Sequence, residues 1–67
     1  MNQSAKDLAD IMTTFMDRNK TVSNLNNYYK KNILVVNLIK DLDKNIYDDL
    51  IGTFKEHKKE ILNKSID

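Results

Sequence analysis

The side chains best suited to chemistry in this chain form two clusters, Tyr28-Tyr29-Lys30-Lys31 and His57-Lys58. A tyrosine ring beside lysines can stack on a nucleobase or hold an apolar side chain of a peptide, while the lysines attract phosphates or carboxylates. On a helix, adjacent side chains point about 100° apart, so we expect one tyrosine in the core and the other at its rim. We therefore predict a binding surface that comprises Tyr28, Tyr29, Lys30, Lys31, His57 and Lys58.

A plainer interpretation competes with this one. The first cluster would then be a solvated lysine pair beside a half-buried ring. In the second, Glu56 and Glu60 alternate with Lys55, Lys58 and Lys59 at spacings that form local ion pairs along a helix. Mixed charge of this kind is typical of a solvated helix face.

Residues for catalysis or metal binding are scarce. The chain has no cysteine and a single histidine, His57, which removes thiolate chemistry and leaves too few ligands for a histidine-based zinc site. The acidic pair Asp48-Asp49 falls in the first turn of a predicted helix, where carboxylates complement the helix dipole. We predict a protein that is not an enzyme and that uses no cofactor and no metal.

Size and charge narrow the class of protein further. The 67 residues allow one domain, residues 1–67, whose core supplies only about 3–5 kcal/mol. Eleven basic and ten acidic residues nearly cancel, so any affinity for nucleic acid must come from a local patch. The longest apolar run, Ile33 to Val36, is too short to span a membrane, and no signal peptide is visible. These features favour a soluble, cytoplasmic protein.

Three helices are predicted to position these side chains, because the chain has no proline and a single glycine. The first helix, about residues 5–18, follows a capping-box-like Ser4-Ala5-Lys6-Asp7 start. The second, about residues 22–41, follows Thr21, and the third, about residues 45–63, follows Asp43 or Asn45. Residues 1–3 and 64–67 should fray. The predicted fold is all-α, a small three-helix bundle.

Apolar residues at three- and four-residue steps mark the sides of the first and third helices that should face inward. They are Leu8, Ile11, Met12, Phe15 and Met16 in the first helix, and Ile46, Leu50, Ile51, Phe54, Ile61 and Leu62 in the third. Gly52 interrupts the third helix, either as a tolerated surface glycine or as a point where another backbone approaches closely.

The stretch from Ile33 to Ile39 is apolar in nearly every direction around a helix, with only Asn37 polar. A short buried strand would explain it, but a lone strand leaves its backbone groups unpaired. The favoured explanation is an interface with a second copy or another protein. We predict that Ile33, Leu34, Val35 and Leu38 lie in this interface.

The order of residues also resembles a small helical module of phage recombination and replication proteins. The residues that carry the resemblance are Thr21, Leu25, Tyr28, Tyr29, Lys30 and Lys31, followed by Leu50, Phe54, His57, Lys58, Glu60 and Ile61. Across residues 11–62 the chain resembles the C-terminal module of single-strand annealing proteins of the RecT and Redβ type, and the small protein associated with the phage UvsW helicase. It is more distantly similar to the Hha family, from which it departs by a longer stretch between Ile33 and Lys44.

This resemblance implies a helical accessory module that recruits a partner protein, such as a partner exonuclease or the acidic C-terminal tail of a single-stranded-DNA-binding protein. Some such modules also contact single-stranded DNA. We therefore expect a non-catalytic interaction module of a phage-type DNA recombination or replication system. The alternative is a free-standing homodimeric helical regulator that binds a host protein and modulates or inhibits it.

Overall fold

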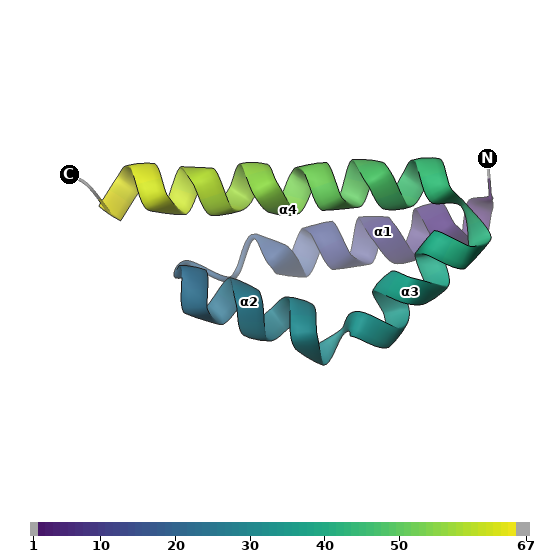
Figure 1. Cartoon of the computed structure of the whole chain (residues 1–67), viewed down its shortest axis with the longest axis horizontal. Helices are drawn as coiled ribbons and strands as arrows, with labels where there is room; N and C mark the ends of the chain where they lie inside the picture. Colours follow the sequence, from purple (N-terminus) through teal and green to yellow (C-terminus); the bar gives the residue numbers. More distant parts are fainter. Residues whose placement is uncertain (1, 66–67) are drawn as a thin grey trace.

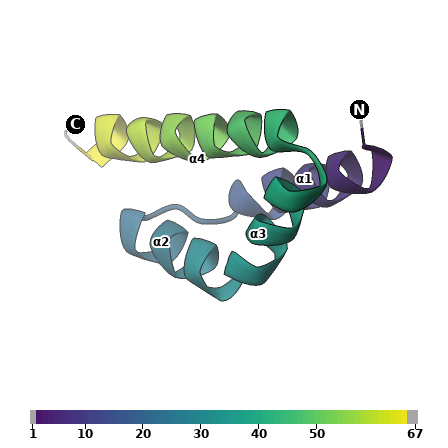
Figure 2. The same cartoon turned by 45° about the vertical axis from the view of Figure 1, so that its right-hand side comes forward.

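The computed structural model describes residues 2–65, which form four α-helices: α1 (Gln3–Met16), α2 (Val22–Lys31), α3 (Ile33–Leu42) and α4 (Lys44–Ser65). The all-helical class agrees with the prediction, and these residues contain no strand. The long helix α4 runs along most of the 40 Å length of the molecule, with α1 beside it (Figure 1). Helices α2 and α3 form the arms of a V whose open side faces α1 and α4 (Figures 1 and 2).

The helix predicted over residues 22–41 is broken at Asn32, so the fold has four helices and the three-helix prediction was wrong in number. The Asn32 side-chain amide donates to the carbonyl of Tyr28 at 2.9 Å, and the backbone leaves helical geometry there with φ −108° and ψ 18°. Asparagine side chains compete with the backbone for helical hydrogen bonds in this way. The carbonyl of Asn32 accepts from the Val36 N–H at 3.0 Å, so α3 begins at once in a new direction.

Side-chain caps set the starts of α1 and α2. The Asn2 side chain accepts from the Ala5 N–H at 3.0 Å, so α1 begins earlier than predicted and Ser4 lies inside it instead of capping it. The Thr21 hydroxyl accepts from a backbone N–H in the first turn of α2 at 3.1 Å, which confirms its predicted role.

Asp43 caps α4, as the sequence indicated. Its Oδ1 accepts from the N–H groups of Asn45 and Ile46 at 3.1 and 3.3 Å. Its Oδ2 accepts from the Asn2 N–H at 3.0 Å, which fastens the start of α1 beside the junction of α3 and α4. These backbone hydrogen bonds, with that from Asn2 the strongest, hold the pKa of Asp43 below its usual value.

The far ends of α1 and α4 also differ from expectation. Helix α1 ends at Met16 and does not reach residue 18. Helix α4 continues through residues 64 and 65, which were expected to fray, while residues 1, 66 and 67 lie outside the described part of the chain.

The core is built from all four helices and is dominated by aliphatic and thioether side chains. Its buried members are Ala5, Met12, Met16, Leu25, Val36, Ile39, Leu50 and Phe54. Only part of the apolar stripe predicted on α1 faces the core. Met12 and Met16 are buried, whereas Ile11 and Phe15 remain 55% and 43% exposed. Leu62 on α4 is also exposed, whereas Ile46, Ile51 and Ile61 are half-buried.

Gly52 lies on the exposed side of α4. A Cβ placed on it would meet no atom within 4 Å among the described residues. No other backbone of the described chain therefore approaches Gly52 closely. Of the two interpretations, the tolerated surface glycine is the one that agrees with the structure.

Candidate functional site

Tyr28 and Tyr29 both project from α2 onto Phe54 of α4, and both are half-buried. The expected division into one core and one rim tyrosine therefore does not describe them. The Tyr28 hydroxyl donates to the carbonyl of Met12 at 2.9 Å, and burial raises the pKa of Tyr28. Because this hydroxyl is used within the fold, Tyr28 is mainly a structural residue.

Tyr29 borders a small cavity between α2 and α4. Its ring meets Phe54 edge-on with centroids 5.2 Å apart, a favourable aromatic arrangement. The cavity has a volume of about 110 Å³ and is lined by Leu25, Asn26, Tyr29, Phe54, Lys55 and Lys58. Lys58 of the predicted binding surface thus lies at the same cavity as Tyr29.

His57 is almost buried, with 12% of its side chain exposed, and it fastens α4 to the segment between α1 and α2. Its Nε2 lies 2.8 Å from the carbonyl oxygen of Asn19. A carbonyl can only accept, so Nε2 carries a proton and donates it. Its Nδ1 lies 3.9 Å from Oδ1 of Asp17. His57 therefore links α4 to the segment between α1 and α2 and is not freely exposed at the surface.

A larger cleft lies where the C-terminal half of α4 passes over the start of α2. It has a volume of about 370 Å³ and is lined by Lys20, Thr21, Val22, His57, Glu60, Ile61 and Lys64. Val22 and Ile61 are half-buried and supply its apolar part. Lys20 and Lys64 are exposed and come from two different segments of the chain. We call this hollow the α2–α4 cleft.

The six residues predicted to bind do not all line one cavity. His57 lines the α2–α4 cleft, and Tyr29 and Lys58 line the smaller cavity. Lys30 and Lys31 are exposed in the last turn of α2, where positive charge complements the helix dipole. They line neither of these two cavities.

Sequence reasoning missed the residues that line the larger cleft, namely Lys20, Val22, Ile61 and Lys64. The sequence prediction places Ile61 in the core, because it belongs to the apolar stripe of the third helix. Whether Val22 of α2 and Ile61 of α4 pack against each other or leave a cleft between them depends on how far α4 extends past α2. Helical periodicity carries no information on that distance.

The predicted interface residues lie on α3 and divide between two sides. Leu34, at 81% exposed, is the most exposed large apolar side chain of the described residues, and Ile33 and Leu38 are also exposed. Val35 is half-buried and packs against the core. The stretch is apolar all round because α3 buries Val36 and Ile39 while Leu34 and Leu38 face outward.

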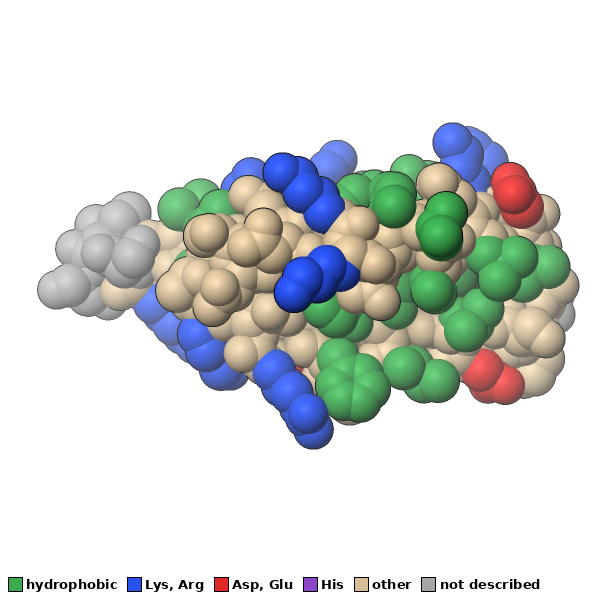
Figure 3. All heavy atoms as spheres, turned by 90° about the horizontal axis from the view of Figure 1, so that it is seen from below, with side chains coloured by type: hydrophobic (Ala, Val, Ile, Leu, Met, Phe, Trp, Pro, Cys, Tyr) green, Lys and Arg blue, Asp and Glu red, His purple; other side chains and the backbone are tan. Residues whose placement is uncertain are grey.

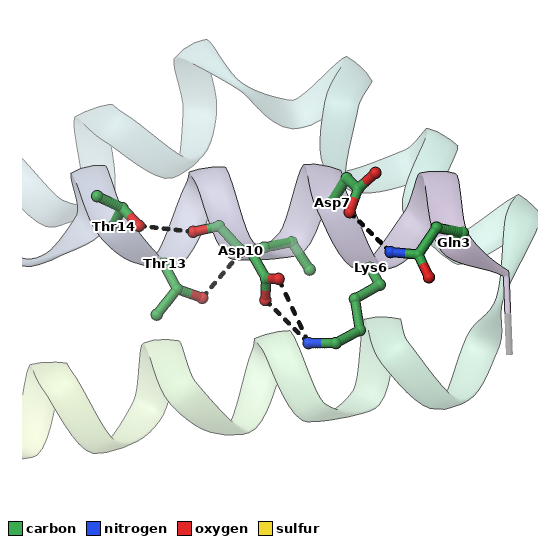
Figure 4. Close-up of polar contacts among 7 residues, drawn as sticks. Gln3, Lys6, Asp7, Asp10, Thr13 and Thr14 are labelled. Carbon is green, nitrogen blue, oxygen red and sulfur yellow. Dashed lines mark hydrogen bonds and ion pairs between the residues drawn. The ribbon is translucent and has the colours of Figure 1, made fainter.

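A third hollow lies between α1 and α4, and Lys6, Asp10 and Thr13 of α1 line part of it. Figure 4 shows the polar contacts that these and other side chains of α1 make with one another. The Lys6 ammonium lies 3.2 Å from Asp10, and the Gln3 amide donates to Asp7 at 2.9 Å. The hydroxyl of Thr13 donates to a backbone carbonyl one turn earlier. All of these contacts are made within α1. The polar side chains beside this hollow therefore have the pattern of a solvated helix face, and we assign no ligand to it.

Residues 2–65 include no group of three histidine, aspartate or glutamate side chains arranged to hold a metal ion. None of the described helices combines the length and the apolar character needed to cross a membrane. Comparison of the chain with protein-family models, curated proteins and solved structures gave no significant match.

Proposed function

We propose that this chain is a non-catalytic interaction module that binds an acidic peptide carrying a large apolar residue. The observation that supports this most directly is the α2–α4 cleft, in which an aliphatic floor lies between lysines. Its volume of about 370 Å³ falls in the range of small-ligand sites, roughly 300–1,000 Å³. In this proposal Val22 and Ile61 contact the apolar residue of the peptide, and Lys20 and Lys64 attract its carboxylates.

The character of the cleft favours a peptide over single-stranded DNA. Proteins that bind single strands stack bases on accessible aromatic rings. The cleft floor is aliphatic, and the rings of Tyr28 and Tyr29 pack against Phe54.

The setting we propose for this activity is a phage-type DNA recombination or replication system, in line with the resemblance described above. The acidic C-terminal tail of a single-stranded-DNA-binding protein has the required chemistry, because it combines carboxylates with an apolar end. Lys58 and Tyr29, at the neighbouring cavity, would extend the contact surface along α2.

The test is an NMR titration of the ¹⁵N-labelled protein with an acidic peptide that ends in an aromatic or aliphatic residue. We expect shifts at Val22, Ile61 and Lys64. The double variant Lys20→Glu/Lys64→Glu should weaken binding at least tenfold, because it reverses both charges at the cleft. Lys30→Glu/Lys31→Glu is the matched control, since it makes the same charge change outside the cleft.

Two further ligands separate the proposal from its competitors. A peptide with serine in place of its apolar end should bind much more weakly, because it leaves the aliphatic floor uncovered. An oligothymidine of the same charge should not compete. Equal loss of binding in both double variants would mean that diffuse charge, and not the cleft, holds the peptide, and the proposal would then be wrong.

A second function is favoured by a separate observation, the exposed leucines of α3. They support the alternative of a homodimeric regulator that acts on a host protein. Peptide binding that is abolished by substitutions on α3, and is indifferent to those at the cleft, would favour this alternative.

A further inference from the structure

Two helices leave apolar stripes uncovered on the same side of the molecule. On α1 the stripe is Ile11 and Phe15, and on α3 it is Leu34, Leu38 and Leu42, each spaced by one helical turn. Helices α1 and α3 pack against each other, so the two stripes lie on neighbouring helices. Figure 3 shows hydrophobic side chains gathered over this part of the surface. We call it the α1–α3 face.

The charges at the two ends of this face have opposite signs. On α1, Asp7 lies one turn before Ile11, and Arg18 follows Phe15 with its guanidinium 4.7 Å from the ring centre. Asp41 follows Leu38 on α3, and Lys31, the last residue of α2, precedes the start of α3.

The contact between Asn2 and Asp43 shows that the start of α1 lies beside the end of α3. Asp7 and Asp41 therefore lie toward one end of the face, and Arg18, after the end of α1, and Lys31, before the start of α3, lie away from that end. Figure 3 shows acidic side chains beside the hydrophobic ones at the end away from the C-terminus, and basic side chains both there and toward the C-terminus. Lys40, near the acidic end, is directed to the ring of Tyr47, 5.4 Å away.

We propose that the α1–α3 face binds a second copy of this chain in an antiparallel, two-fold arrangement. A two-fold axis in the interface, perpendicular to the helices, places α1 on α1 and α3 on α3 with their directions reversed. Asp41 then faces Lys31 of the partner subunit, and Asp7 faces Arg18 of the partner subunit. An axis parallel to the helices would bring like charges together, and the charge pattern disfavours it.

Size and net charge are compatible with this occupant. A stable interface covers about 800 Å² of each partner, roughly a sixth of the 4830 Å² surface of one chain. The net charge of +1 brings little repulsion between copies. This inference uses a different surface from the α2–α4 cleft, so it stands or falls independently of the proposed function.

The test is sedimentation velocity of the full chain over a wide concentration range. We expect a reversible dimer, and Leu34→Lys should abolish it without changing the circular dichroism spectrum, because this side chain is almost fully exposed. Asn27→Lys, an exposed substitution on α2, is the control with the same added charge.

Charge exchange then tests the arrangement. Asp41→Lys and Lys31→Asp should each weaken self-association about tenfold, because each places like charges opposite one another twice per dimer. An equimolar mixture of the two variants should regain the association of the unaltered protein, since both cross-subunit pairs are then complementary. A chain that stays monomeric at millimolar concentration overturns the proposal, and so does a mixture that associates no better than its components.

Discussion

At the scale of single residues, the side chains that looked most reactive in the sequence turn out to hold the fold together. The nearly buried ring of His57 is hydrogen-bonded to the backbone carbonyl of Asn19. The hydroxyl of Tyr28 donates a hydrogen bond to the backbone carbonyl of Met12. The sequence shows that these side chains can form hydrogen bonds, but the partner of His57 lies 38 positions away and that of Tyr28 lies 16 positions away. No local pattern predicts such a contact, because it depends on how the helices meet.

Tyr28→Phe tests this structural role. The change removes a hydroxyl that donates to the Met12 carbonyl at 2.9 Å and keeps the ring against Phe54. We expect a loss of about 1 kcal/mol in the free energy of unfolding, or roughly 4–8 °C in melting temperature for a domain of this size. Tyr29→Phe is the control, since the Tyr29 hydroxyl makes no hydrogen bond to another described residue. Equal effects of the two variants would show that the Tyr28 hydrogen bond contributes nothing specific.

At the scale of helices, periodicity and capping residues predicted most of what is observed. The first and last helices lie close to their expected positions, and Thr21 and Asp43 cap α2 and α4. The break at Asn32 could not be predicted, because the apolar spacing continues straight through it. An asparagine side chain offers the backbone an alternative to the helical hydrogen bonds, but its identity alone does not say where the helix will break. Here the bend lets Leu25 of α2 and Val36 of α3 both reach the core.

Asp43 joins three of these elements and makes the fold sensitive to acid. Its carboxylate accepts from backbone N–H groups at the starts of α1 and α4, which lowers its pKa from the usual 3.8. A lowered pKa means that the charged form stabilises the fold. That contribution is fully present above pH 3.8 and is lost as the pH falls through the lower value of the folded state.

Asp43→Asn should therefore unfold more easily than the unaltered protein at pH 7, and this difference should shrink as the pH falls below 4. Asparagine is a good cap, so the variant removes the charge and keeps an acceptor oxygen. Urea unfolding of both proteins from pH 7 to pH 2 measures the difference. Asp49→Asn, an exposed acidic position on α4, controls for the change in net charge. A difference that stays constant down to pH 2 would show that the charge of Asp43 does not stabilise the fold.

At the scale of the whole molecule, the two proposed surfaces lie toward opposite ends of an elongated chain. The α2–α4 cleft is near the C-terminal end of α4, and the α1–α3 face includes the opposite end, where Asn2 meets Asp43. An antiparallel dimer therefore carries its two clefts at its far ends, apart by a distance comparable to the 40 Å length of one chain. Together, the two proposals predict a dimer that binds two tails of one multivalent partner at once.

Two acidic tails joined by a flexible linker test this geometry. A linker of about 60 residues has a mean span of roughly 40–45 Å, which matches the expected separation, whereas five residues reach at most about 18 Å. The long-linked pair should bind at least tenfold more tightly than a single tail, because the second contact becomes intramolecular. The short-linked pair should show no such gain. Isothermal titration calorimetry measures both, and with the Leu34→Lys variant the gain should vanish while single-tail affinity stays unchanged. A gain that persists in this variant would mean that the two tails bind one chain, and that the dimer does not pair the clefts.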